Sequence, residues 1–362
     1  MPDVKLAPAP RPAVMRMKEY HPPLGDRDGL RLDFNENTLQ CSPRVLDALR
    51  SITAADLTRY PQREPLEALV AKQLQLRPGQ VLLTNGVDEA VHLLVETYLD
   101  AGDEVLFPVP TYSMYEVYAS GIGARAMVVP ADADFAFPFE RLLGAISPRT
   151  RLILIANPNS PSGTTATRAQ LLQIAERAPH AVVLVDEAYF HFFGETVIDQ
   201  IGRIPNLVVT RTFSKAYGLA GLRLGMIAAA AETMHWLRRV ISPYSVNSLA
   251  LACLRPALAD EKYLQWYVAE VLAARIDFTR ALTRLGVPHW PSAANFVLAR
   301  IGATHKQFVD SMRRRGVLVR DRSVDHGCAG CVRITIGTRE QTMSAINALE
   351  ETLREMQWRR DG

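Results

Sequence analysis

Side chains that can do chemistry follow directly after several apolar runs of this sequence. Asp186 comes immediately after the run Ala181–Val185, and Lys215 comes five residues after the run Leu207–Thr210 ends. A loop rich in amide and hydroxyl groups, NPNSPSGT at 157–164, follows a third run at 151–156. Neighbouring strands of a parallel sheet bring their carboxyl ends to one edge, where such sheets bind ligands. The order therefore predicts one site that combines a carboxylate, an amine and several hydrogen-bonding groups.

A fourth strand end adds groups that suit a phosphate. The segment Gly86–Asp88 follows the apolar run Gln80–Thr84 and opens a predicted helix, whose free N–H groups and dipole favour an anion. Hydroxyls and a guanidinium lie near the amine in sequence, at Thr212, Ser214 and Arg223. A phosphate cradle, an amine and a carboxylate together match pyridoxal phosphate. Its aldehyde needs a lysine for a Schiff base, and its ring nitrogen needs a carboxylate so that the protonated ring can accept electrons.

Each feature alone has an ordinary explanation. A lysine is usually a surface residue, an aspartate at a strand end is often a helix cap, and the Asn-Pro-Ser-Gly loop is a typical turn. Four such features in order, each at a predicted strand end, favour a site. Few amines are available for this role. The lysines are Lys5, Lys18, Lys72, Lys215, Lys262 and Lys306, and all except Lys215 lie in segments without neighbouring groups that could take part in the chemistry.

The elements that position these groups predict an α/β fold. Unalternated apolar strands at 80–84, 104–107, 151–156, 181–185 and 207–210 alternate with helical segments, as in a mostly parallel sheet covered by helices on both faces. We expect the strand at 104–107 to end at Pro108. After about residue 241 a long helix (262–285), strands at 295–300, 317–320 and 331–336, and a final helix (341–356) indicate a smaller α+β domain. The expected division is an N-terminal arm at 1–30 that packs with the small domain or a partner subunit, a large cofactor-binding domain at 31–242 and a small C-terminal domain at 243–362.

Composition excludes several classes of protein. The 362 residues are 48% hydrophobic and 22% charged, with a net charge of +3, which argues for a globular chain that binds neither nucleic acid nor membrane. The proline-rich start has no signal-peptide run and predicts an extended arm rather than a first helix, so a cytoplasmic protein is expected. Cys328 and Cys331 form a lone CxxC pair, for which packing at the start of a strand is favoured over a zinc or redox site. No metal is expected.

Eight segments carry a resemblance to a known family: LDFNENT (32–38), RYP (59–61), GVDE (86–89), PTYSMY (110–115), NPNSPSGT (157–164), DEAY (186–189), RTFSKAYGLAGLRLG (211–225) and RITIGTRE (333–340). With them the chain resembles, from about Leu32 to Leu353, the fold-type-I pyridoxal-phosphate aminotransferases, and within these the histidinol-phosphate aminotransferase family. The resemblance implies transfer of an amino group between histidinol phosphate and 2-oxoglutarate, giving imidazole-acetol phosphate and glutamate, by a ping-pong mechanism.

The resemblance also implies residue roles. Lys215 would form the Schiff base and move the proton, Asp186 would pair with the ring nitrogen, and Tyr189 would donate to the ring's 3-oxygen. Around the cofactor it places Gly86, Val87, Asp88, Tyr112 stacked on the ring, Thr212, Ser214, Arg223, and Tyr60 donated by the second subunit of a homodimer. The substrate anion would meet Arg320 and Arg333, with Tyr20 of the arm closing over it.

One position departs from the family pattern. The family usually has asparagine immediately before Pro-Thr-Gly, in contact with the 3-oxygen, whereas this chain has Ser160 there and Asn159 one residue earlier. Either Tyr189 makes that contact alone or Asn159 reaches in. Three other functions stay open: an aminotransferase for aromatic or other 2-oxo acids, a decarboxylase of a phosphorylated amino acid on the same scaffold, and a non-catalytic pyridoxal-phosphate-binding module.

Overall fold

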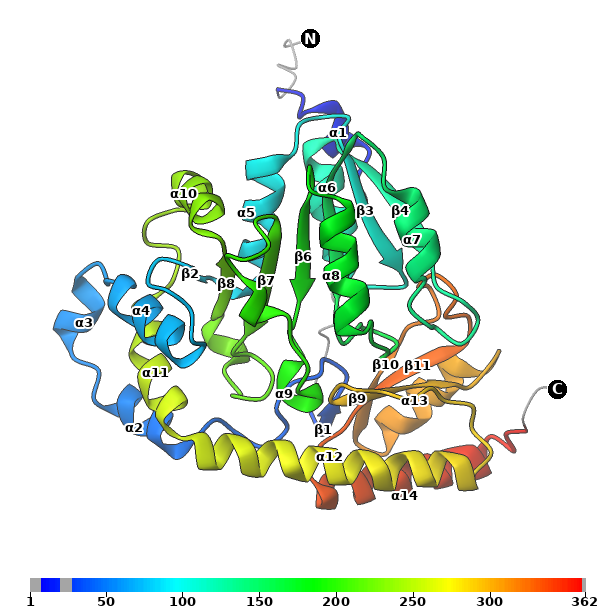
Figure 1. The fold of residues 1–362 in the computed structure, drawn as a ribbon. Coiled ribbons are helices and arrows are strands. Elements are labelled where there is room, and N and C mark those ends of the chain that lie inside the picture. The colour runs from blue at the N-terminus through cyan, green and yellow to red at the C-terminus, as the bar shows by residue number, and fades with distance from the viewer. Residues whose placement is uncertain (1–7, 20–27, 360–362) are drawn as a thin grey trace, which may run out of the picture.

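The computed structural model describes residues 8–19 and 28–359, which form two sheets with helices packed around them (Figure 1). The larger sheet has seven strands in the order β2-β8-β7-β6-β5-β3-β4, and the smaller has four in the order β1-β10-β11-β9. The strands of the larger sheet are β2 (Val81–Thr84), β3 (Glu104–Val109), β4 (Arg125–Pro130), β5 (Thr150–Ala156), β6 (Val182–Asp186), β7 (Leu207–Thr212) and β8 (Gly225–Ala229). Those of the smaller sheet are β1 (Leu30–Leu32), β9 (Phe296–Arg300), β10 (Val317–Asp321) and β11 (Cys331–Thr335).

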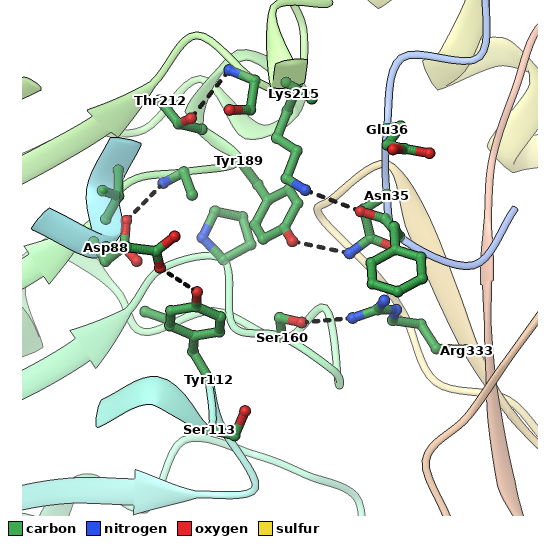
Figure 2. Close-up of a pocket in the computed structure, with 18 of the residues that line it drawn as sticks. Asn35, Glu36, Asp88, Tyr112, Ser113, Ser160, Tyr189, Thr212, Lys215 and Arg333 are labelled. Carbon is green, nitrogen blue, oxygen red and sulfur yellow. Dashed lines mark hydrogen bonds between the residues drawn. The ribbon is translucent and has the colours of Figure 1, made fainter. Parts of the chain in front are cut away.

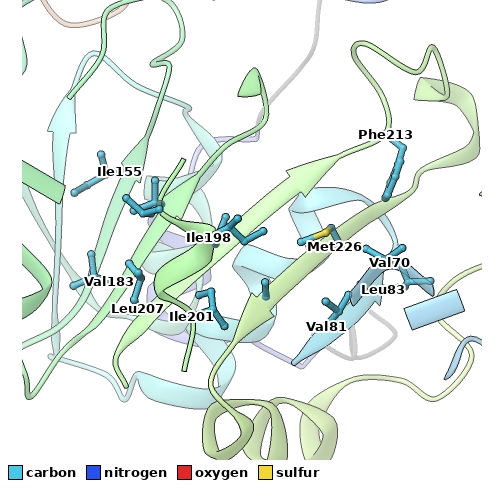
Figure 3. Close-up of a cluster of buried hydrophobic side chains, with 14 of the residues drawn as sticks. Val70, Val81, Leu83, Ile155, Val183, Ile198, Ile201, Leu207, Phe213 and Met226 are labelled. Carbon is cyan, nitrogen blue, oxygen red and sulfur yellow. The ribbon is translucent and has the colours of Figure 1, made fainter. Parts of the chain in front are cut away.

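The strands of the large sheet are buried on both faces because alternate side chains enter different cores. In β5, Ile153 and Ile155 pack into one apolar cluster, and Leu152 and Leu154 pack into the other. Figure 3 shows part of the first cluster, which also takes in side chains of α2 (Pro43–Arg50), α4 (Glu64–Gln73), α7 (Phe139–Ala145), α8 (Arg168–Arg177) and α11 (Ser248–Ala259). The second cluster includes α5 (Gly86–Tyr98), α6 (Met114–Ile122) and α10 (Ala231–Val240).

A third core joins the small sheet to its helices. It contains Phe296 of β9 and Phe308 of α13 together with Phe278 of the long helix α12. The helices are α12 (Glu261–Arg284), α13 (His305–Arg314) and α14 (Arg339–Glu355), and α12 runs along α14 beneath both sheets in Figure 1. Two short helices, α3 (Ala54–Thr58) and α9 (Phe190–Phe193), complete the described α-helices together with α1 (Pro12–Met15).

Several sequence predictions need correction. Strand β3 continues through Pro108 to Val109, and its ladder with β5 ends at Leu106, so the missing N–H of Pro108 interrupts no bond on that side. Strands β4 and β8 were not expected, and β8 runs antiparallel to both β2 and β7. The sheet is therefore mixed, although the ladders joining β4, β3, β5, β6 and β7 are parallel.

The N-terminal arm also differs from the expectation. Residues Pro12–Met15 form one helical turn rather than extended chain, because proline is well tolerated at the first helical position. This turn lies against α6, where the Arg11 guanidinium donates to the Gly121 carbonyl at 2.8 Å, rather than against the small domain. Strand β1 then pairs in parallel with β10, so the expected boundary between residues 30 and 31 falls within a strand of the small sheet.

The two cysteines of the CxxC pair lie in an apolar cluster. Cys331 is the first residue of β11, and Cys328 is in the turn before it, with both side chains buried against Phe135 and Leu298. Within residues 8–19 and 28–359, no group of three or more His, Cys, Asp or Glu side chains is arranged to hold a metal ion. None of the helices described is long and apolar enough to span a membrane.

Candidate active site

A cavity of about 490 Å³ opens at the carboxyl ends of β5, β6 and β7, next to the N-terminus of α5. Twelve of the residues predicted from sequence line it: Val87, Asp88, Tyr112, Ser160, Asp186, Tyr189, Thr212, Ser214, Lys215, Arg223, Arg320 and Arg333. Figure 2 shows many of these side chains converging from both sheets. The topology thus gathers groups that are up to 246 residues apart, from 87 to 333, around one space.

Asp186 is the last residue of β6, and its carboxylate is buried at the bottom of the cavity. Its Oδ1 accepts hydrogen bonds from the Thr210 hydroxyl at 3.0 Å and the Ala188 N–H at 3.2 Å, and its Oδ2 accepts one from the Tyr115 hydroxyl at 3.1 Å. Burial raises the pKa of Asp186 to about 6, even though these three donors act to lower it. A cation placed beside this carboxylate would be strongly favoured.

Lys215 lies in the turn after β7 and faces Tyr189 and the segment that follows β1 (Figure 2). Its Nζ donates to the Phe34 carbonyl at 3.0 Å and lies 6.0 Å from the centre of the Tyr189 ring. The Tyr189 hydroxyl accepts a hydrogen bond from Asn35 Nδ2 at 2.9 Å. An amine, a phenol and an amide therefore meet on the side of the cavity opposite α5.

The first turn of α5 and the loop after β7 form an anion cradle. Gly86 has φ +77°, a conformation that favours glycine, and a Cβ there would lie 2.7 Å from Arg223 Nη2, so a side chain at this position would displace the guanidinium. Arg223 Nη2 pairs with Asp88 Oδ2 at 2.9 Å, and Asp88 also accepts a hydrogen bond from Tyr112. The Thr212 hydroxyl accepts from the Ser214 N–H at 3.0 Å, which fixes the loop that bears both hydroxyls.

Arginines from the small sheet close the other end of the cavity. Arg320 of β10 and Arg333 of β11 are directly opposite each other in the antiparallel ladder. Arg333 is only 7% exposed, and it donates from Nη1 to Ser160 Oγ at 3.0 Å and from Nη2 to the Asp33 carbonyl at 2.8 Å. Burial, together with the nearby guanidiniums of Arg322 and Arg320, lowers the pKa of Arg333 to about 10, so it remains a cation at neutral pH.

Four predicted residues do not line this cavity. Gly86 lies behind it as described. Asn159 turns away, because its side chain bonds Thr111, Ser162 and the Pro110 carbonyl, and Ser160 faces the space instead. Tyr60 is 77% exposed and stacks on Tyr244 with ring centres 4.2 Å apart. Tyr20 lies outside the described residues.

Sequence reasoning missed several polar residues of the site, among them Asn35, Tyr115, Thr210 and Arg322. Two signals were available. Asn35 and Tyr115 stand inside the segments LDFNENT and PTYSMY, and Arg322 is two residues after Arg320, a spacing that in a strand puts two side chains on one face. No local signal marks Thr210, which only the pairing of β6 with β7 brings opposite Asp186.

The donor set suits pyridoxal phosphate group by group. The buried carboxylate fits a cationic ring nitrogen, the amine fits an aldehyde, and the helix N-terminus with Arg223 and the hydroxyls fits a phosphate. The strongest of these observations is the absence of a side chain at Gly86, because a Cβ there would occupy the space beside the Arg223 guanidinium.

Comparison with known proteins agrees with this assignment. The profile of the family described as "Aminotransferase class I and II" matches residues 27–349. This chain belongs to that family. The enzyme is therefore a transaminase that depends on pyridoxal phosphate, and the predictions of a fold-type-I aminotransferase fold and of its cofactor are confirmed.

Individual relatives point in the same direction. The enzyme is 34% identical to a histidinol-phosphate aminotransferase of Caldanaerobacter subterraneus subsp. tengcongensis, over 89% of this chain and 93% of that one. It is 36% identical to one of Symbiobacterium thermophilum, over 95% and 99%. A crystal structure of histidinol-phosphate aminotransferase from Sinorhizobium meliloti in complex with pyridoxal-5'-phosphate superposes with a TM-score of 0.88 at 25% identity, covering 97% of this chain and 99% of that chain.

Proposed function

We propose that the enzyme transfers an amino group between histidinol phosphate and 2-oxoglutarate, producing imidazole-acetol phosphate and glutamate. The observation that carries the substrate is the arginine end of the cavity, where Arg333 and Arg320 face the space that holds the amine Lys215. Guanidinium groups bind phosphate and carboxylate oxygens in pairs, so the same arginines can take the phosphate ester and then the carboxylate of the second substrate. The names of the relatives support the same substrate.

The proposal gives each polar group of the cavity a task. When bound, pyridoxal phosphate supplies an electron sink for the charge that develops at the substrate Cα. The carboxylate of Asp186 holds a proton on the ring nitrogen, and ionised Asp186 is stabilised in turn by Thr210, Tyr115 and the Ala188 N–H. Lys215 Nζ would be the group that carries the proton between the substrate Cα and the cofactor.

The remaining residues hold the cofactor in place. The N–H groups of Val87 and Asp88, the hydroxyls of Thr212 and Ser214, and Arg223 would bind its phosphate, while Tyr112 would cover the ring. At the 3-oxygen, Tyr189 would donate its hydroxyl proton, which is free for that purpose because Asn35 donates to Tyr189 rather than accepting from it. Ser160 lines the cavity and would be the second polar group for the 3-oxygen, since Asn159 is engaged in its own loop.

A substrate panel on purified enzyme tests the reaction. We expect histidinol phosphate with 2-oxoglutarate to be turned over at a kcat/KM at least about 100-fold above that for phenylalanine, because a phosphate dianion offers the arginines more negative charge and more acceptor oxygens than the single carboxylate of phenylalanine. Preference for phenylalanine would refute the substrate. Release of carbon dioxide from a phosphorylated amino acid would favour the decarboxylase.

The role of Lys215 is tested separately. The enzyme should show the visible absorbance of a lysine-bound cofactor, and borohydride reduction should label Lys215. Lys215→Ala should hold the cofactor without a covalent bond and lose transamination, whereas Lys262→Ala on α12 should keep both properties. A protein that stays colourless with added cofactor would exclude the enzyme and favour the non-catalytic module. Labelling at another lysine would refute the role of Lys215.

The proposal includes a cytoplasmic homodimer in which Tyr60 reaches the phosphate of the partner's cofactor. Tyr60 and Tyr244 expose 77% and 52% of their surface, and Leu57 exposes 63%, which is an unusual apolar group for an uncovered surface. Tyr60 also lies outside the cavity of its own chain.

Subunit complementation tests the shared site. Tyr60→Ala and Lys215→Ala should each have little activity alone. Unfolding and refolding them together should restore up to about a quarter of wild-type activity, because half of the dimers are mixed and each mixed dimer has one complete site. No recovery, or a monomer in solution, would refute the sharing of Tyr60.

A further inference from the structure

Arg322 is a cation at the substrate end of the cavity that the sequence motifs do not assign. It follows the last residue of β10, lines the cavity together with Arg320 and Arg333, and is largely buried, with 12% of its side chain exposed. Its backbone N–H donates to the Cys331 carbonyl at 2.9 Å, which closes the loop between β10 and β11 at its base. The loop therefore holds Arg322 beside the cavity rather than leaving it on a free surface.

Among the residues that the structure describes, the ion-pair partner of the Arg322 guanidinium comes from the same loop. Asp325 forms an ion pair with Arg322 Nη2, and the carboxylate is itself only 19% exposed. A turn bond from the Asp325 N–H to the Arg322 carbonyl at 2.9 Å fixes the two residues relative to each other. The Nε atoms of Arg322 and Arg333 are buried without a hydrogen-bond partner among residues 8–19 and 28–359, so neither guanidinium is fully satisfied by the described residues.

The charges at this end of the cavity sum to a value that suits a phosphate ester. The guanidiniums of Arg320, Arg322 and Arg333 all interact electrostatically with the Asp325 carboxylate. These four groups together carry a net charge of about +2 when Asp325 is ionised. Glu36 also lines the cavity, but it is paired with Arg31 at 3.8 Å. A phosphate monoester carries a charge of about −1.5 to −2 at pH 7, whereas a side-chain carboxylate carries −1.

We propose that Arg322 is a third guanidinium for the substrate's phosphate and that Asp325 is its internal counter-ion. Asp325 orients Arg322 toward the cavity and limits the net charge there, so the site binds the phosphate dianion tightly and still releases a monocarboxylate. The inference rests on the proposed function, because it specifies how the substrate's anionic group is recognised. It makes Arg322 a determinant of the preference for phosphate esters over carboxylates.

Three variants of the cofactor-loaded enzyme test this assignment. Arg322→Gln removes the guanidinium, Asp325→Asn removes only the counter-ion, and Arg314→Gln is the matched control, since Arg314 pairs with Glu355 at 2.9 Å on the outer side of α13. Arg322→Gln should raise the KM for histidinol phosphate about 10- to 100-fold, as expected for the loss of one or two charge-assisted bonds, with kcat within about 3-fold. The KM for glutamate should change less than about 3-fold.

Asp325→Asn should act in the opposite direction. Removing a carboxylate near the bound anion should lower the KM for histidinol phosphate about 2- to 5-fold at low ionic strength, an effect that added salt removes. Arg314→Gln should leave both KM values unchanged. If Arg322→Gln leaves the KM for histidinol phosphate within 2-fold, or if both pocket variants raise both KM values alike, the ion pair only shapes the loop and the proposal is overturned.

Two further measurements keep the outcome decisive. Should Arg322→Gln fail to fold, Arg322→Lys replaces it, because an amine keeps the charge but cannot bind Asp325 and a phosphate with a planar fork, and a rise in KM of about 5-fold or more is expected. Should wild-type enzyme not turn over histidinol phosphate at all, the proposed function fails, and inorganic phosphate serves as the probe through its effect on the cofactor's visible absorbance. Weaker phosphate binding in the variant then supports the role of Arg322, and equal binding overturns it.

Discussion

The hydroxyl of Tyr115 should control the protonation of Asp186, although the sequence alone predicts no role for this tyrosine. It is one of the three donors to this buried carboxylate, at 3.1 Å from Oδ2, and its ring is itself fully buried. Tyr115→Phe removes this donor and leaves the ring. A hydrogen bond to a charged group contributes about 1.5–3 kcal/mol, and about 1.4 kcal/mol corresponds to one pKa unit. Its loss should therefore raise the pKa of Asp186 from about 6 to between about 7 and 8.

The consequence is a pH-dependent loss of cofactor affinity. At pH 7 a group of pKa about 6 is about 90% ionised, and one of pKa 7–8 is about 50–10% ionised. Because ionised Asp186 is the proposed partner of the ring nitrogen, the variant should hold pyridoxal phosphate about 2- to 10-fold more weakly at pH 7. At pH 9 both proteins are ionised at this position, and the ratio of their affinities should return to about 1.

Titration of the apoenzyme with pyridoxal phosphate, followed by visible absorbance at pH 7 and at pH 9, measures this ratio. Tyr118→Phe is the control, because Tyr118 is on the same helix, stacks on His92 and makes no bond to Asp186. A ratio of about 1 at pH 7, or an equal loss at both pH values, would show that the Tyr115 hydroxyl does not act through the ionisation of Asp186.

Three other changes should have measurable effects. Gly225→Ala would put a Cβ 2.6 Å from the Gly86 carbonyl carbon and 2.8 Å from the Val87 nitrogen, so cofactor binding should weaken at least about 10-fold in titrations, whereas Gly144→Ala in α7, with open space around it and outside the cavity lining, should bind normally. The raised pKa of Asp186 means that the folded apoprotein binds this proton more tightly than the unfolded chain does. The stability it contributes is present below about pH 4 and lost as pH rises through about 6, so wild type should lose melting temperature relative to Asp186→Asn between pH 4.5 and pH 7.5, and a constant difference would contradict this. Glu187→Ala would leave Arg211, 2.8 Å away and almost buried, without its carboxylate, and should lower the free energy of unfolding by about 3–5 kcal/mol in urea, whereas a loss below about 1 kcal/mol would mean that water replaces the pair.

The sequence predicts the parallel part of the fold well because its signals are local. Buried parallel strands are continuous apolar runs, and β5, β6 and β7 are found within one or two residues of the predicted ranges. Strand β8 was missed because its residues, Gly225–Ala229, are mostly small and directly follow a glycine-rich loop. The turn at Pro12–Met15 was missed because a proline that begins a helix and one that prevents it look alike in sequence.

The site divides in the same way. Lys215, Asp186 and the start of α5 could be found because each lies at the end of a strand or within a few residues after it, and strand ends converge in any sheet of this kind. The partners of these groups could not. Thr210 and Tyr115 reach Asp186, and Phe34 reaches Lys215, only through packing between segments far apart in the chain. Whether Asn159 or Ser160 faces the cavity likewise depends on hydrogen bonds inside one loop.

The short segment after β1 is bonded to both halves of the molecule. Asn35 receives a hydrogen bond from Asn295 at its carbonyl and bonds Thr335 in the small sheet, and its amide donates to Tyr189 beside the large sheet. The neighbouring Phe34 carbonyl holds the Lys215 amine. A displacement of one sheet relative to the other must therefore stretch or break these bonds at the reacting groups themselves. The position of the small sheet is therefore coupled to the Lys215 amine through the backbone of residues 33–35.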